Sequence, residues 1–205
     1  MAGFRHHPQT IKNGFQEITK RHFHTGGGIV SPWPEQVWGY KIGRLTMAAT
    51  RVFIHGLEST GQGTKGVYFR ERYPGMIIED YTGSLEERLA KLEMVLSGKE
   101  DLIIVGSSYG GLMGAIFACR HPERLRRLIL LAPAINLEEF AVYAGKETTV
   151  PVHLYHGRRD EVVPPGEVRE IAARTFTRLT YRLLEDDHSL HETFPRLPWP
   201  ELLRD

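Results

Sequence analysis

The chain has 205 residues, of which 41% are hydrophobic and 25% are charged, a composition typical of soluble globular proteins. This length suits one domain and argues against a separate cofactor module, and the composition excludes a disordered, collagen-like or coiled-coil chain. The formal net charge of +1 provides no global field that would attract nucleic acid. The single cysteine allows no internal disulfide and favours a reducing compartment, so we predict a cytoplasmic protein.

Residues 1–46 differ from the rest of the chain. They contain six Lys and Arg residues against two acids, a charge of +4, whereas the remaining 159 residues hold 20 basic and 23 acidic residues, a charge of −3. Hydrophobic periodicity is nearly absent there, so we expect a poorly ordered segment ahead of a domain at 47–205. It is a flexible leader, a docking tail or residues ahead of the true start, and the change in composition after Met47 favours the last.

Neither a secretory signal nor a membrane span is predicted. No uninterrupted apolar run precedes Leu45, and the longest run in the chain, Leu128–Ile135, is far shorter than the roughly 20 residues that a spanning helix needs. Four histidines lie within 1–46, but no cysteine and no regular helical spacing accompanies them, so a metal site is not favoured.

From Arg51 onward, short apolar runs alternate with amphipathic stretches, which is typical of β-α-β units. We therefore predict an α/β fold with a doubly wound, mostly parallel sheet of about six strands flanked by helices. The predicted strands are Arg51–His55, Met76–Asp80, Asp101–Gly106, Leu128–Ala132, Val152–His156 and Thr180–Leu184. The predicted helices are Lys65–Arg72, Leu85–Leu96, Tyr109–His121, Leu137–Tyr143 and Gly166–Thr175. Three prolines after His188 allow at most a broken helix at the end of the chain.

The turn between the third strand and the third helix predicts a nucleophile. Functional groups of open sheets lie in the loops beyond the carboxyl ends of the strands, and this loop has the sequence Gly106-Ser107-Ser108-Tyr109-Gly110. A serine at the tip of such a sharp turn needs nearly side-chain-free residues two positions before and after it. The pattern favours Ser108 as an exposed nucleophile over a glycine-rich turn without chemistry.

A serine hydroxyl becomes an effective nucleophile when an imidazole accepts its proton and an acid orients that imidazole. Asp160 follows the strand ending at His156 and is the predicted acid, with Glu161 as its nearest rival. His188 is the first histidine after the last strand and is preferred as the base over His191. Three other histidines of the domain are expected to have structural roles: His121, His153 and His156.

Acyl transfer also needs N–H donors for the charge that develops on the carbonyl oxygen. Tyr109, directly after the serine, is one predicted backbone donor. The loop after the first strand supplies the other, which is Leu57 or its neighbour Glu58. His55 is expected to shape that loop as a buried, hydrogen-bonded residue.

Other features of the sequence give little support to a different function. The loop 56–63 nearly matches a phosphate-binding loop, but Gln62 and Gly63 stand where Lys and Ser or Thr are required, so nucleotide binding is not favoured. No dinucleotide-binding motif is present at Ser108. Cys119 is expected to be a small core residue, because no adjacent base is evident.

Five motifs between about residues 50 and 190 together resemble those of the α/β-hydrolases. They are His55-Gly56, Asp80-Tyr81-Thr82-Gly83-Ser84, Gly106-Ser107-Ser108-Tyr109-Gly110-Gly111, His156-Gly157-Arg158-Arg159-Asp160 and Asp187-His188. The resemblance implies Ser108 as nucleophile, His188 as base and then acid, and Asp160 as the orienting acid. It implies backbone oxyanion donors at Leu57 and Tyr109, and no metal or organic cofactor.

The sequence departs from the family in two ways. Members normally begin with two further strands, and 1–46 contains no convincing pair. Only about 18 residues, Pro133–Val150, separate two strands between which many relatives insert a helical lid. The chain is therefore similar to compact, nearly lidless bacterial esterases and thioesterases with a minimal cap.

We expect a serine hydrolase that cleaves carboxylic esters or thioesters through an acyl-enzyme, with a small-molecule ester or acyl thioester as substrate and no nucleic acid as partner. A non-catalytic binding protein on the same fold and a peptide or amide hydrolase that uses the same triad are the alternatives. The acyl specificity and the oligomeric state stay open.

Overall fold

The computed structural model describes residues 48–205. The predicted basic, poorly ordered segment 1–46 lies outside the described residues, so that expectation stays a prediction. Within the described part of the chain, no helix has the length and apolar character needed to cross a membrane.

The centre of the fold is a six-stranded sheet in the order β2-β1-β3-β4-β5-β6, and every neighbouring pair is parallel. The strands are β1 (Thr50–Ile54), β2 (Ile77–Ile78), β3 (Leu102–Ser107), β4 (Leu125–Leu131), β5 (Thr148–Gly157) and β6 (Phe176–Leu184). The predicted doubly wound α/β class is confirmed.

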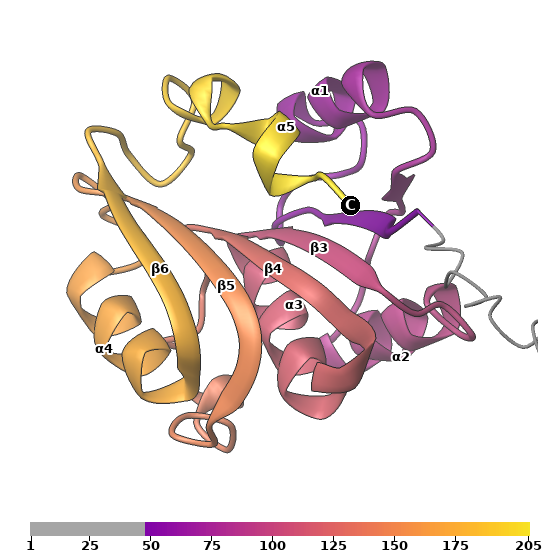
Figure 1. The fold of residues 1–205 in the computed structure, drawn as a ribbon. Helices are drawn as coiled ribbons and strands as arrows, with labels where there is room; N and C mark the ends of the chain where they lie inside the picture. The colour runs from indigo at the N-terminus through magenta and orange to yellow at the C-terminus, as the bar shows by residue number, and fades with distance from the viewer. Residues whose placement is uncertain (1–47) are drawn as a thin grey trace, which may run out of the picture. The chain divides into compact units, whose positions relative to one another are not determined.

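Helices cover both faces of the sheet (Figure 1). The helix α1 (Thr64–Arg72) and the short C-terminal α5 (Trp199–Leu202) lie on one side, and α2 (Leu85–Val95), α3 (Tyr109–Arg120) and α4 (Pro165–Thr175) lie on the other. Three single 3₁₀ turns complete the described elements, at Pro122–Arg124, Glu138–Phe140 and Phe194–Arg196.

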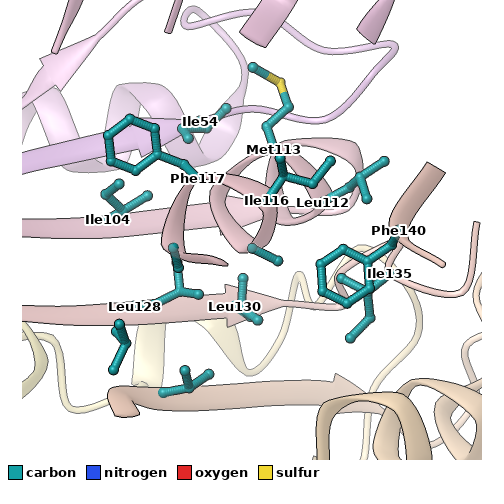
Figure 2. Close-up of a cluster of buried hydrophobic side chains, with 14 of the residues drawn as sticks. Ile54, Ile104, Leu112, Met113, Ile116, Phe117, Leu128, Leu130, Ile135 and Phe140 are labelled. Carbon is teal, nitrogen blue, oxygen red and sulfur yellow. The ribbon is translucent and has the colours of Figure 1, made fainter. Parts of the chain in front are cut away.

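Because helices cover both faces of the sheet, its strands are apolar at successive positions. Successive side chains of a strand point to opposite faces, so Ile104 of β3 joins the core under α2, α3 and α4, whereas Ile103 and Val105 join the core under α1 and α5. Figure 2 shows Phe117 of α3 beside Ile54 and Ile104 of the sheet. Burial of both faces stabilises the sheet by about 25 cal/mol for each Å² of apolar surface removed from water.

The start and the buried face of α2 both follow from its own sequence. Ser84 caps its N-terminus by accepting the backbone N–H of Glu87, whose carboxylate accepts the N–H of Ser84 in return, a reciprocal pair typical of helix starts. Leu89 and Leu92 on one face of the helix are buried, as is Leu96 at its end. The predicted helix Leu85–Leu96 is confirmed to within one residue.

The predicted helix Leu137–Tyr143 is wrong. The segment forms only the 3₁₀ turn at Glu138–Phe140. Phe140 is completely buried, while Leu137 and Val142 are exposed, so the segment has no continuous apolar face to pack as a helix.

The predictions also placed the starts of the last two strands four residues late. β5 begins at Thr148 and β6 at Phe176, because the two strands pair from Thr148 opposite Phe176 onward. β6 is an edge strand with mostly exposed or half-buried side chains, so no apolar run marks its first half in the sequence.

Candidate active site

The Ser108 turn is strained and tightly packed. Ser108 has φ 54° and ψ −117°, a conformation that costs a residue with a side chain about 1–3 kcal/mol. A Cβ on Gly106 would overlap the carbonyl oxygen of Gly110, and a Cβ on Gly110 would overlap that of Ile54. Both positions therefore require glycine, and the turn presents the Ser108 hydroxyl at the carboxyl edge of the sheet.

The structure brings Ser108, His188 and Asp160 together in one hydrogen-bonded chain. Ser108 Oγ lies 3.0 Å from His188 Nε2, and His188 Nδ1 lies 2.8 Å from Asp160 Oδ2. The Asp160 side chain is fully buried. Because a carboxylate oxygen only accepts, Nδ1 carries the proton, and Nε2 is left with a lone pair that can accept the serine proton. The predicted rivals Glu161 and His191 make no contact of this kind among the described residues.

Asp160 receives N–H groups on both carboxylate oxygens. The backbone N–H groups of Val162 and Val163 donate to Oδ1 at 2.9 and 2.8 Å. Oδ2 faces a second imidazole besides His188, since His156 Nε2 lies 2.9 Å away. His156 is completely buried at the end of β5. The sequence predicted a structural role for His156, and none of its motifs indicates this contact.

The loop that carries His188 is held by Asp186, a residue for which the sequence motifs predicted no role. Asp186 is buried and accepts the backbone N–H groups of Asp187, Glu192 and Thr193, together with the Thr193 hydroxyl. Burial alone would raise the pKa of Asp186, but these hydrogen bonds outweigh it and lower the pKa, since they stabilise the charged form.

A lysine from α1 makes a second anchor of the same loop. Lys65 Nζ donates to the carbonyl oxygen of Ser189 at 2.7 Å, one residue beyond His188. Burial lowers the pKa of Lys65, and the nearby carboxylates of Asp186 and Asp187 partly oppose that effect. The position of His188 therefore depends on contacts from both sides of the loop.

The two predicted oxyanion donors lie beside the serine. A Cβ on Gly56 would be 3.4 Å from Ser108 Cβ, so the loop after β1 packs directly against the serine. Within residues 48–205, the backbone N–H groups of Leu57 and Tyr109 have no hydrogen-bond acceptor. Tyr109 is also the first residue of α3, where free N–H groups carry partial positive charge.

His55 fits its predicted role as a scaffold for that loop. It is 2% exposed; its Nδ1 lies 2.7 Å from the carbonyl oxygen of Gly56, and its Nε2 accepts the backbone N–H of Tyr81 at 3.0 Å. Both ring nitrogens are thus satisfied by backbone groups, which leaves no free nitrogen for chemistry.

A cavity of about 580 Å³ opens above Ser108. Its wall includes His188, Leu57, Leu137 and Val162, and the last three side chains are 51, 38 and 70% exposed. These three residues, which we call the apolar rim, come from the loops after β1, β4 and β5. The described part of the chain holds no cluster of three His, Cys, Asp or Glu residues suited to a metal ion.

The other residues singled out in the sequence lie away from this hydrogen-bonded chain. His121 contacts Glu93 at 2.8 Å, and His153 is half-buried on β5. Cys119, predicted as a core residue, is partly buried and packs against the core; burial raises the pKa of its thiol to about 11, so the thiol stays protonated at neutral pH.

Part of the chain matches a known protein family. Residues 58–148 match the model of a family described as the alpha/beta hydrolase fold. This segment includes Ser108 but neither Asp160 nor His188. No curated protein matches the sequence.

Solved structures share the fold at low sequence identity. The mouse alpha/beta hydrolase domain-containing protein 10 is 22% identical, with a TM-score of 0.61 over 71% of this chain and 84% of that one. Est1E from Butyrivibrio proteoclasticus is 17% identical, with a TM-score of 0.63 over 76% and 86%. The monoacylglycerol lipase of Paleococcus ferrophilus is 15% identical, with a TM-score of 0.58 over 76% and 96%.

Residues 58–148 thus match the α/β-hydrolase family model, and the described chain has the fold of the solved α/β-hydrolases, as its sequence motifs predicted. The family match and the shared fold support a hydrolase. Fold alone does not determine which bond is cleaved, so that question turns on the residues around Ser108.

Proposed function

We propose that this protein is a serine hydrolase that cleaves carboxylic esters or thioesters through an acyl-enzyme. The observation that carries the proposal is the continuous contact from Ser108 Oγ to His188 Nε2, at 3.0 Å, and from His188 Nδ1 to Asp160, at 2.8 Å. The three residues follow the chain order serine, acid, histidine that is expected on this fold.

In the first half of the reaction, Ser108 Oγ attacks the carbonyl carbon while His188 Nε2 takes its proton. The negative charge moves to the carbonyl oxygen, for which the backbone N–H groups of Leu57 and Tyr109 are the proposed donors. Asp160 stabilises the His188 imidazolium that forms. His188 then gives the proton to the departing oxygen or sulfur, the bond to the leaving group breaks, and the acyl group stays on Ser108.

In the second half, water replaces the leaving group. His188 takes a proton from water as the hydroxide attacks the acyl-enzyme, and it returns that proton to Ser108 Oγ as the carboxylic acid departs. No net oxidation or reduction occurs, and the active site is regenerated. Both halves use the same lone pair on His188 Nε2.

The apolar rim supports an acyl substrate. Exposed apolar side chains gathered at one site mark ligand-binding surfaces more often than isolated ones do, and the apolar rim borders the Ser108 cavity. An apolar acyl chain that leaves water for this surface gains about 0.8 kcal/mol for each CH₂ group that is buried. Only the 3₁₀ turn at Glu138–Phe140 lies between β4 and β5, so no long helical insertion of the described chain covers the cavity there.

The decisive experiment compares the wild-type protein with Ser108→Ala on p-nitrophenyl esters and acyl thioesters. We expect the substitution to lower kcat by about 10⁶-fold, as for a triad that acts as a unit, and to abolish labelling by a fluorophosphonate. Ser107→Ala is the matched control, because Ser107 is the neighbouring serine at the end of β3 and has no part in the proposed chain; its fluorophosphonate labelling should persist.

The outcomes separate the proposal from its alternatives. Tight ligand binding without acylation in the wild-type protein would favour a non-catalytic binding protein. Cleavage of amides in preference to esters and thioesters, with the same dependence on Ser108, would favour a peptide or amide hydrolase.

A further inference from the structure

His156 is a buried polar group that the proposed mechanism leaves unused. It is 0% exposed at the end of β5. Its Nε2 lies 2.9 Å from Asp160 Oδ2 and 3.0 Å from the carbonyl oxygen of Val163. Its other ring nitrogen, Nδ1, is buried and has no hydrogen-bond partner among the described residues.

These contacts determine the protonation of the ring. Both neighbours of Nε2 are acceptors, so Nε2 carries the hydrogen. A second proton on Nδ1 would be buried without an acceptor, which is costly. Burial lowers the pKa of His156 and the nearby His188 lowers it further, against the raising effects of Val163 and Asp160. His156 is therefore a neutral N–H donor at neutral pH.

An unsatisfied buried nitrogen is a cost to the folded state of about 1–3 kcal/mol. An apolar side chain of similar volume would avoid that cost, so packing alone does not explain an imidazole here. The group that an imidazole provides and an apolar side chain lacks is the Nε2–H, which donates to the Val163 carbonyl and lies 2.9 Å from Asp160 Oδ2.

We infer that His156 is a positioning residue, which holds Asp160 Oδ2 in line with His188 Nδ1 and thereby acts on the reaction of Ser108. Two imidazoles then share Oδ2, while the backbone N–H groups of Val162 and Val163 hold Oδ1. Because His156 is neutral, it orients the carboxylate without cancelling the negative charge that stabilises the His188 imidazolium. This inference rests on the proposed function.

The first test removes the Nε2–H donor of His156 but keeps a side chain of similar volume. His156→Met should lower kcat by about 10- to 100-fold, the equivalent of one hydrogen bond to a charged group, with KM changed by less than about twofold. The melting temperature is expected to change little, because removal of the unsatisfied Nδ1 is offset by loss of the hydrogen bond to the Val163 carbonyl. His156→Leu is a second donor-free variant if the Met variant does not fold.

Two further variants separate orientation from packing. His156→Gln keeps an amide N–H near the place of Nε2 and should recover most of kcat. His153→Met is the matched control, since His153 lies on the opposite face of the same strand and is not within hydrogen-bond distance of Asp160 among the described contacts; it should retain the wild-type kcat.

A double-mutant cycle tests whether His156 acts through Asp160. In an Asp160→Asn background, His156→Met should slow the fluorophosphonate labelling of Ser108 by less than about threefold, because the carboxylate it orients is gone. The same loss in both backgrounds, or a lowered melting temperature with no recovery by His156→Gln, would overturn the inference. Full activity of Ser108→Ala would instead overturn the proposed function, so the two failures are distinguishable.

Discussion

The Ser108 turn and the His188 loop supply the two ends of one hydrogen-bonded chain, yet they are built differently. The turn depends on two glycines, each two positions from the serine, because a Cβ at Gly106 would overlap the turn itself and a Cβ at Gly110 would overlap the end of β1. The loop depends on residues from elsewhere, including Lys65 of α1 and Asp160 of the loop after β5. Glycines at a fixed spacing around a serine can be recognised in a sequence motif, whereas a set of long-range side-chain contacts cannot.

The largest expected effect comes from breaking the turn. Gly110→Ala places a Cβ against the carbonyl oxygens of Ile54 and His55, so we expect a loss of about 3 kcal/mol or more in the free energy of unfolding and loss of activity. Gly166→Ala is the control, because Gly166 is likewise the second residue of a helix but has open space around its Cβ position. Thermal denaturation of both variants checks this, and equal melting temperatures would contradict it.

Loosening the His188 loop should have a smaller effect that depends on pH. Asp186→Asn removes a charge that accepts four hydrogen bonds, so we expect about 2 kcal/mol of destabilisation at pH 7, together with a lower kcat. Because the pKa of Asp186 is lowered in the folded protein, its contribution is present above the unfolded pKa of about 3.9. That contribution is lost as the pH falls through the folded value.

Urea denaturation at several pH values measures this dependence. The difference between the wild-type protein and Asp186→Asn should shrink as the pH falls below about 4. Glu185→Gln is the control, since Glu185 pairs with Arg158 on the exposed surface and such pairs contribute little. A difference that stays constant down to pH 2 would show that the Asp186 charge is not responsible.

The smallest expected effect concerns the apolar rim, which neither builds the turn nor holds the loop. Val162→Ser should reduce kcat/KM for p-nitrophenyl octanoate by about 3- to 10-fold relative to the acetate, with stability unchanged. Val142→Ser is the control, because Val142 is similarly exposed, at 63%, and is not part of the cavity wall. A uniform effect of Val162→Ser on both esters would show that the rim does not contact the acyl chain.

The sequence predicted most of the fold because both faces of the sheet are buried. Apolar runs such as Leu102–Val105 mark strands that must be covered on two sides, and the spacing of leucines in α2 marks one buried face. The exposed edge strand β6 and the segment around Phe140 lack such patterns, and these are the places where the predicted limits or the predicted helix failed.

By itself, the sequence predicted the α/β-hydrolase fold, the Ser108 turn and the choice of Asp160 and His188 as candidates, because motif spacing and chain order can be read along the chain. Only the tertiary structure decided that Asp160 Oδ2 faces two imidazoles and that Asp186 and Lys65 hold the His188 loop. Strand alternation places His156 on the same face of β5 as Leu154, but the direction of its Nε2–H depends on how the chain folds back at Asp160. Hydrogen bonds between residues that are distant in the sequence depend on the tertiary fold, so the spacing of residues along the chain does not predict them.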